Sequence, residues 1–262
     1  HYQLVIPIDQ LSFTPNMKTI ETQRLYRRIA DQIREGIQAG KWALGSRLPP
    51  ERDLAPLLGV SRPSLREALI ALEVEGLIAV RTGSGIYVQA ASGSGPATGV
   101  EARAEWGPLE VMRARQVIEV EVAALAAQNA RSAEIARMRD AIQLMRDDVA
   151  QHQAPRRGDE AFHLAIASAC GNDVLTEMVE QTWAARDGAM FARFGDHFEH
   201  PVAWQHAIAE HDHVLSAIET GDAAGARRAM RQHIKQAIRR YTANWQVVNA
   251  QKSNGRESRN HD

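Results

Sequence analysis

One carboxylate and three imidazoles in the second half of the chain have the types and spacing of metal ligands. Asp159 and His163 lie four residues apart in DEAFH, so a helix would place both side chains on one face. His211 and His233 lie further along, in AEHDHVLSAI and AMRQHIKQAI, whose apolar residues follow a helical period. Side chains from three helices can meet around one ion in the core of a bundle. Imidazole and carboxylate ligands suit zinc, nickel, manganese or iron, and the spacing does not choose among these metals.

The same four residues have plainer explanations, which the sequence leaves open. An Asp and a His at this spacing commonly form a surface pair or cap a helix, and the other two histidines could be satisfied inside a core. A metal with open coordination positions could also activate water, so a metal-dependent enzyme fused to a second domain is an alternative hypothesis. The sequence has no HExxH motif and no phosphate-binding glycine loop. No general base lies at a spacing from the four residues that would indicate catalysis. We therefore predict that the protein is not an enzyme and has no catalytic residues.

A second group of residues, in SRPSLRE, has the chemistry that reads DNA. Ser61 is a good N-cap for a helix in which Arg62 and Arg66, four residues apart, would share one face. Arginine can donate two hydrogen bonds to guanine, which is the commonest specific contact between a protein and a base. The hydroxyl groups of Ser61 and Ser64 can bind phosphate beside the free amides of a helix start. The pattern predicts a helix that enters the major groove.

The elements around SRPSLRE have the order of a winged helix-turn-helix. Apolar residues recur every four positions over residues 24–40, which predicts an amphipathic helix. ERDLAPLL predicts a short second helix that opens with Arg52, ahead of the helix with the two arginines. LIAV and IYV predict a hairpin whose glycine-rich turn carries Arg81, Thr82 and Gly83. Arg52 and this turn could contact the DNA backbone or the minor groove.

The rest of the chain predicts a separate helical domain. Residues 91–99, ASGSGPATG, have no apolar period and indicate a flexible linker. The predicted fold class is mainly α, with an N-terminal winged helix-turn-helix followed by an all-α antiparallel helical bundle. Helices are expected at 107–129, 132–152, 157–170, 173–192, 202–219 and 222–246. The expected parts are an N-terminal extension (1–20), a DNA-binding domain (21–90), a linker (91–103), an all-helical effector-binding domain (104–247) and a disordered tail (248–262).

Charge and cysteine content agree with a two-domain protein that binds nucleic acid. The 262 residues have a net charge of −1, but residues 24–90 carry 10 basic and 7 acidic residues, whereas residues 101–240 carry 17 and 21. A basic N-terminal part is typical of a DNA-binding module. The single cysteine, Cys170, indicates a reducing compartment, and no stretch has the pattern of a membrane span or a signal peptide. We expect a cytoplasmic protein.

The run GSRLPPERDLAPLLGVSRPSLREALIALEVEGLIAVRTGSGIYV closely resembles the DNA-binding domain of the GntR family of regulators. The resemblance covers roughly residues 24–88, and Pro50 stands where the family usually has a small polar residue. In that family, the residues that contact DNA correspond to Arg52, Arg62, Arg66, Thr82 and Gly83. The resemblance implies that this domain binds double-stranded DNA.

Residues 107–240 resemble the FCD effector domain of the FadR-type subgroup of that family, in ARQVIEVEVAALAA, DEAFHLAIASACGN and AEHDHVLSAIETGDAAGARRAMRQHI. The resemblance implies one divalent transition metal per chain, which we predict to be zinc, with nickel, manganese and iron as alternatives. Its ligands would be Asp159, His163, His211 and His233. Arg115, four residues before Glu119, would hold the carboxylate of a small effector, and Asn172 would cap a helix or line the effector pocket. TWAARDGAMFARF resembles regulators of hexuronate and related sugar-acid catabolism.

These expectations combine into a DNA-binding transcription regulator. We predict a repressor of a catabolic operon that a small carboxylate or sugar-acid effector, bound at the metal site, releases from DNA. One helix-turn-helix reads only a few base pairs, so we expect a homodimer on a palindromic operator. A third hypothesis is a nucleoid-type DNA binder whose helical domain is only structural. Turnover of a sugar acid would favour the enzyme hypothesis, and a DNA affinity that no ligand changes would favour the nucleoid hypothesis.

Overall fold

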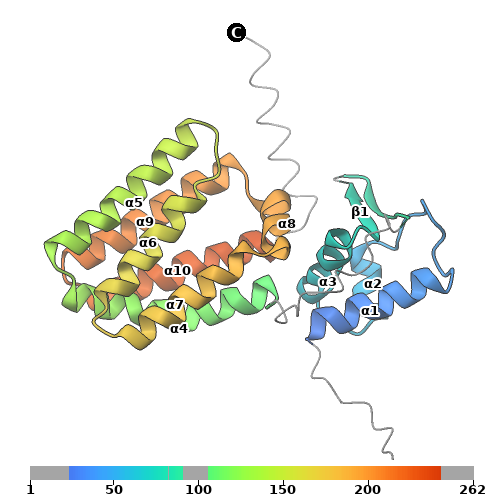
Figure 1. Ribbon diagram of the computed structural model, residues 1–262, viewed down its shortest axis with the longest axis horizontal. Coiled ribbons are helices and arrows are strands. Elements are labelled where there is room, and N and C mark those ends of the chain that lie inside the picture. The colour runs from blue at the N-terminus through green and yellow to red at the C-terminus, as the bar shows by residue number, and fades with distance from the viewer. Residues whose placement is uncertain (1–23, 82, 91–105, 243–262) are drawn as a thin grey trace, which may run out of the picture.

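The computed structural model describes residues 24–81, 83–90 and 106–242, which form an N-terminal winged helix-turn-helix and a C-terminal helical bundle (Figure 1). The predicted fold class is thereby confirmed. The expected N-terminal extension, linker and tail, together with Thr82, lie outside the described residues. Within the described ranges, every helix is too short or too polar to cross a membrane.

The N-terminal domain, which is the predicted DNA-binding domain, consists of three helices and a hairpin. Its elements are α1 (Leu25–Gln38), α2 (Glu51–Leu57), α3 (Arg62–Val74), and the antiparallel strands β1 (Ile78–Arg81) and β2 (Gly85–Val88). Ile33, Leu54 and Leu65 are buried between the helices, as the apolar spacing predicts. The predicted N-cap of α3 is confirmed, because Ser61 Oγ accepts a hydrogen bond from the Ser64 amide at 3.2 Å.

The bundle consists of seven α-helices and one short 3₁₀ helix within residues 106–242. They are α4 (Pro108–Asn129), α5 (Ser132–Ala150), α6 (Arg156–Ala169), α7 (Asp173–Ala184), η2 (Ala185–Asp187), α8 (Ala189–Phe198), α9 (Pro201–Glu219) and α10 (Ala223–Thr242). α10 packs against α4 and α9, and α5 packs against α6 and α9. The inner faces of α4, α6, α9 and α10 therefore surround one core (Figure 1).

The prediction of one helix over residues 173–192 is wrong. α7 ends at Ala184, and Gly188 adopts an extended backbone (φ −71°, ψ 155°) that starts a separate helix, α8. Gly195, expected to begin a break, lies inside α8 and is buried. A Cβ atom on Gly195 would lie 2.2 Å from Arg156 Nη2, so the end of the flexible Arg156 side chain would have to move if this glycine were replaced. Glycine occurs both at helix ends and within helices. The sequence alone therefore does not show that Gly188 precedes a new helix and that Gly195 lies inside it.

α3 is the part of the DNA-binding domain that contacts the bundle. It packs against α8 and against the start of α4. Glu67 of α3 is buried and accepts a hydrogen bond from the amide of Leu109 at 2.8 Å. The N-cap residue of α4, Gly107, has no side chain to do this. The carboxylate of one domain therefore caps a helix of the other.

This contact makes the stability of the protein depend on pH. Burial raises the pKa of Glu67 from 4.5 to about 7, although the Leu109 amide and Arg113 favour the charged form. Between these two values the folded protein retains a proton that the unfolded chain has lost, so the free energy of unfolding falls as pH rises. The full effect is about 3 kcal/mol at most.

We therefore expect wild type to lose stability relative to Glu67→Gln as pH rises from 4.5 to 7. The glutamine stays neutral and can still accept the hydrogen bond from Leu109. Urea unfolding of both proteins at several pH values measures the difference. Parallel stability profiles would show that the carboxyl group of Glu67 does not titrate in this range.

Candidate metal centre and DNA-reading helix

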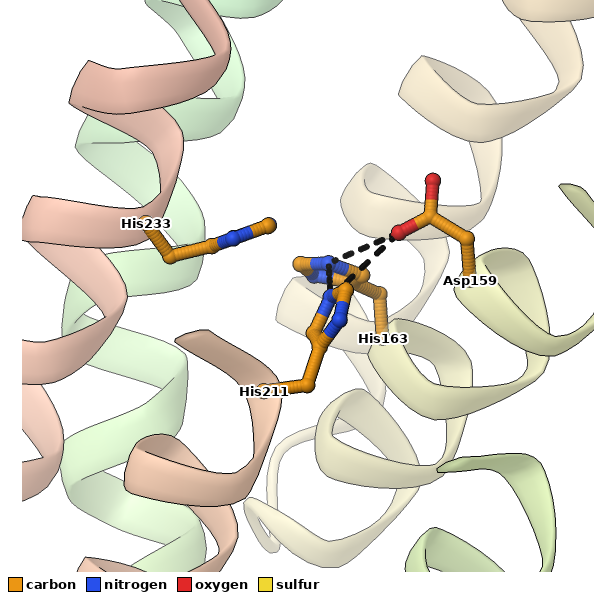
Figure 2. A group of neighbouring side chains, drawn as sticks. All are labelled: Asp159, His163, His211 and His233. Carbon is orange, nitrogen blue, oxygen red and sulfur yellow. Dashed lines mark hydrogen bonds and ion pairs between the residues drawn. The ribbon is translucent and has the colours of Figure 1, made fainter. Parts of the chain in front are cut away.

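The structure brings the four predicted metal ligands together in the core of the bundle (Figure 2). One ligand atom from each of Asp159, His163, His211 and His233 lies within 4.8 Å of the others. His211 Nε2 lies 3.1 Å from His163 Nε2 and 3.3 Å from Asp159 Oδ1. α6 supplies Asp159 and His163 from successive turns, and α9 and α10 supply one imidazole each. All three imidazoles are buried, so the cluster is a polar site within an apolar core.

Two carboxylates outside this cluster orient its imidazoles. Glu119 of α4 accepts a hydrogen bond from His163 Nδ1, and Glu210 of α9 accepts one from His233 Nδ1 at 2.8 Å. Such outer carboxylates fix the tautomer of a ligating histidine and increase its basicity. Sequence reasoning noted Glu119 only as the partner of an arginine, and it missed Glu210. Glu210 immediately precedes one of the metal ligands in AEHDH, which was the available signal.

Burial and neighbouring charges give Asp159, His163 and His233 the protonation states that a metal requires. Burial lowers the pKa of His163, and burial followed by the charge of His211 lowers the pKa of His233 to about 3. Burial would raise the pKa of Asp159, but its hydrogen bond with His211 and the charge of Arg186 hold it well below its ordinary value. His163 and His233 are therefore held in the neutral form and the carboxyl group of Asp159 is held ionised, which are the forms that bind metals.

The donor set fits a divalent transition metal. Because His163 and His233 donate from Nδ1, each presents an Nε2 lone pair toward the cluster. Neither lone pair can be satisfied by Asp159, which is ionised and only accepts. His211 Nε2 lies 3.1 Å from His163 Nε2 and can donate to it, whereas His211 Nδ1 is buried with no partner among the described residues. A cation would provide a common partner for the imidazole nitrogens and the carboxylate. Three imidazoles and one carboxylate are suitable ligands for zinc, nickel, manganese or iron.

A pocket opens beside the candidate metal centre, and the predicted effector residue Arg115 lies in its wall. Arg186 and His233 also line the pocket. Arg115 is buried, donates from Nε to Glu119 Oε1 at 2.6 Å, and lies with its guanidinium 4.0 Å from the ring centre of Trp183. The arginine is therefore held in position where a ligand carboxylate could pair with it.

Asn172 has one of the two roles that were expected of it. It is the N-cap of α7, where its side chain accepts a hydrogen bond from the Leu175 amide at 3.2 Å. It is exposed to solvent and is not among the residues that line the described pocket. The expectation that Asn172 binds the effector is therefore not met, because capping places this side chain at the outer end of its helix.

Most of the predicted DNA-contacting residues that the structure describes are accessible. Arg52, Ser61, Arg62 and Arg81 are exposed, and Ser64 is partly buried. Arg81 lies 4.7 Å from the ring centre of Tyr87 at the hairpin, and Gly83 has a positive φ of 73° that shapes the turn. The first turn of α3 and the hairpin could therefore contact DNA together.

Arg66 differs from this group, and the expectation that it shares an exposed face with Arg62 is wrong. Only 2% of Arg66 is exposed. Its guanidinium makes two hydrogen bonds to Glu51, at 2.7 and 3.0 Å, and lies 5.5 Å from the ring centre of Phe198. It also donates to the carbonyl of Tyr241 at 3.4 Å. The bundle therefore covers one of the two arginines, from positions more than 100 residues away in the sequence.

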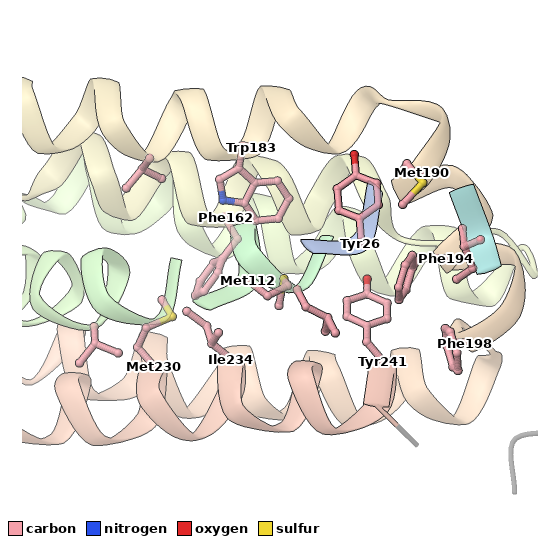
Figure 3. Packing of buried hydrophobic residues seen from close by; sticks show 14 of the residues in the cluster. Tyr26, Met112, Phe162, Trp183, Met190, Phe194, Phe198, Met230, Ile234 and Tyr241 are labelled. Atoms are coloured by element: carbon pink, nitrogen blue, oxygen red, sulfur yellow. The ribbon is translucent and has the colours of Figure 1, made fainter. Parts of the chain in front are cut away.

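Phe198 contacts Arg66 through its ring and Tyr241 does so through its backbone carbonyl. Both belong to a group of aromatic residues at one end of the bundle, which we call the aromatic cluster: Phe194, Phe198 and Tyr241 (Figure 3). The ring centre of Phe194 lies 5.6 Å from the ring centre of Phe198 and 5.8 Å from the ring centre of Tyr241. Beside this cluster, His197 Nε2 pairs with Glu73 of α3 at 2.7 Å. α3 thus contacts α8 through an arginine at one turn and a glutamate two turns later.

Comparison with known proteins gives matches to both domains. Residues 25–88 match the profile of bacterial regulatory proteins of the gntR family, and residues 110–236 match the FCD domain. The Uxu operon transcriptional regulator of Escherichia coli (strain K12) is 38% identical over 224 residues, which are 83% of this chain and 87% of that protein. The Exu regulon transcriptional regulator of the same strain is 33% identical over 223 residues, with coverage of 84% and 85%.

A third relative extends the range of regulators. The putative L-lactate dehydrogenase operon regulatory protein of Escherichia coli (strain K12) is 31% identical over 221 residues, which are 81% of this chain and 84% of that protein. All three relatives are regulators and none is an enzyme by its description, so the hypothesis of a metal-dependent enzyme is not supported. The chain belongs to the GntR family of bacterial regulatory proteins and is a DNA-binding transcription regulator with an FCD domain.

Proposed function

We propose that this regulator is a repressor of a catabolic operon and that a small carboxylate or sugar-acid effector, bound at a divalent metal, releases it from DNA. One observation carries the proposal: Arg115 lines the same pocket as Asp159 and His233, two members of the four-ligand cluster. A metal with open positions would bind carboxylate and hydroxyl oxygens of an acid, and Arg115 would pair with the carboxylate. Relatives named for the Uxu operon and for an L-lactate dehydrogenase operon make an organic acid a reasonable effector.

The aromatic cluster supports the proposal that the effector controls DNA binding. Phe198 and Tyr241 line the pocket, and the same two residues contact Arg66 of the recognition helix. An effector that fills the pocket would stabilise the arrangement of α8 and α10 in which Arg66 is covered. Arg66 would have to leave Phe198 and Tyr241 to contact a base, so the effector would favour the form that is released from DNA.

The protein is proposed to act in the cytoplasm as a homodimer on a palindromic operator. The exposed arginines of one domain reach too few bases for a specific site, and two-fold pairing would double these contacts. Light scattering in the presence and absence of operator DNA tests this part of the proposal. A monomer under both conditions would contradict it.

Arg62→Ala is expected to weaken operator binding by about 1–3 kcal/mol, which is roughly 5- to 150-fold. Arg62 lies exposed in the first turn of α3, so its loss should affect DNA binding without affecting folding. Fluorescence anisotropy with an operator selected from random DNA measures the affinity. Arg137→Ala, which removes an exposed arginine from α5, is the control. Equal affinities of both variants for the operator would refute the assignment of α3 to the groove.

The same anisotropy assay tests the proposed effector response. D-Glucuronate, D-galacturonate and L-lactate are added to the complex of metal-loaded protein and operator. Release of the DNA by at least one acid, and loss of this release after treatment with a chelator, is the expected result. An operator affinity that none of these acids changes in metal-loaded protein would favour the nucleoid hypothesis instead.

A further inference from the structure

Trp204 carries a buried hydrogen-bond donor that has no partner within the described part of the chain. Its indole nitrogen Nε1 is shielded from solvent, and the side chain lines the pocket beside the candidate metal centre. An unpaired buried N–H is uncommon in proteins, because it loses its hydrogen bonds to water and gains none in return. A donor of this kind in a pocket wall is satisfied when a ligand offers an oxygen.

The spacing of Trp204 and the candidate ligand His211 along α9 determines how far apart these two helix positions are. It precedes His211 by seven residues, which is close to two helical turns, so both side chains lie on the same side of the helix. Seven residues correspond to about 10 Å along a helix axis. Trp204 lines the same pocket as the candidate ligands Asp159 and His233, from a position about two turns of α9 before His211.

Small side chains leave space between Trp204 and the candidate metal centre. Ala207 lies on α9 between Trp204 and His211, and Ala237 lies one turn beyond His233 on α10. Both alanines line the pocket. A larger residue at either position would reduce the space in the pocket for an elongated ligand that reaches from the metal centre toward the indole.

The length of this path separates classes of organic acid. A three-carbon acid has two C–C bonds, each of which advances an extended chain by about 1.25 Å, so it spans roughly 2.5 Å and is too short to contact both ends. A six-carbon acid has five such bonds and spans roughly 6 Å, and contacts of about 2–3 Å at each end complete the path. The oxygen that meets Trp204 would be a hydroxyl or carbonyl group at the end of the chain opposite the carboxylate.

We infer that Trp204 is a specificity-determining residue whose indole N–H binds an oxygen at the far end of the effector. This inference rests on the proposed function. It selects polyhydroxy acids of about six carbons over acids of two or three carbons, and over acids of equal length without oxygens at the far end. The carboxylate is bound near Arg115 and His233, and the donor of Trp204 reads the opposite end.

The test compares three acids that differ in length and in distant oxygens: gluconate, 2-hydroxyhexanoate and L-lactate. Calorimetric titration of metal-loaded wild type is expected to give a higher affinity for gluconate than for 2-hydroxyhexanoate. Trp204→Phe keeps an aromatic ring and removes the donor, so it should lower the affinity for gluconate by about 3- to 10-fold. It should leave the affinities for 2-hydroxyhexanoate and L-lactate unchanged.

The outcomes separate this inference from the proposed function. If none of these acids binds, both the proposed function and the inference about Trp204 fail. If gluconate binds and Trp204→Phe retains the full preference for it, or loses affinity for all three acids equally, the inference alone is overturned. The melting temperature of the ligand-free variant gives a further check, because removal of an unpaired donor should not lower it. If the variant does not fold, the test uses the NMR resonance of the Trp204 indole N–H in the wild-type protein. This resonance should shift when gluconate is added and should not shift when 2-hydroxyhexanoate is added.

Discussion

Chelation of the metal is expected to lower the melting temperature of the wild-type protein by on the order of 10 °C and to have no effect on His211→Ala. A metal present at about 1,000 times its dissociation constant stabilises the folded state by about 4 kcal/mol. For a protein of this size, each kcal/mol corresponds to about 2–4 °C. His211 contributes a central ligand, since its Nε2 contacts both His163 and Asp159. Its loss should remove the metal and the response to the effector together.

His213→Ala is the matched control, because this histidine lies two residues further along α9 and is exposed. It should retain the metal, the sensitivity to chelator and the effector response. Elemental analysis of protein purified without chelator gives the metal content directly. If wild type contains no transition metal, and added zinc, nickel or manganese leaves the melting temperature unchanged, the cluster is a structural group of histidines.

Arg115→Ala is expected to lose roughly 10- to 100-fold in affinity for a carboxylate effector, while the four metal ligands and the metal content remain. The structure adds a second effect that the sequence did not indicate. Arg115 is the buried partner of Glu119, and removal of one member of a buried pair costs about 3–5 kcal/mol at most. Glu119 keeps His163 and the Trp183 indole as partners, so we expect a smaller loss.

Two variants distinguish ligand binding from stability. Arg115→Lys keeps the positive charge without the planar pair of donors, so it should recover stability more fully than effector affinity. Arg227→Ala removes an exposed arginine that pairs with Glu121 on the outer side of α4, and it should change neither property appreciably. Effector titrations and metal analyses of these proteins decide the question. An Arg115→Ala protein that is still released from DNA at wild-type effector concentrations would show that Arg115 does not bind the carboxylate.

Local patterns in the sequence predict most of the helices, whereas the set of four candidate metal ligands follows from those patterns together with the resemblance to the FCD domain. The apolar period of each helix depends on residues three or four positions apart, and Asp159 and His163 have this spacing within one helix. The cap at Ser61 depends on an amide three residues later. These features depend on neighbours in the chain, whereas the apolar period does not show the extended backbone of Gly188 that separates α7 from α8.

The errors at the functional surfaces concern contacts between distant segments. Arg66 has the same spacing from Arg62 as a second base-reading arginine would have, but Phe198 and Tyr241 cover it from the other domain. Glu210 orients His233 on the neighbouring helix, and helical spacing gives no sign of this pair. A one-dimensional pattern does not show which of several suitable faces a second domain will bury.

Phe198 and Tyr241 belong to two surfaces at once, the wall of the pocket and the cover over Arg66. Thermodynamic reciprocity follows for any ligand that acts through them: the factor by which an effector weakens DNA binding equals the factor by which DNA weakens effector binding. Operator DNA would therefore act as an antagonist of the effector. The effector concentration needed for half-maximal induction would rise with the number of operators that the regulator occupies, and it would exceed the dissociation constant of the free protein.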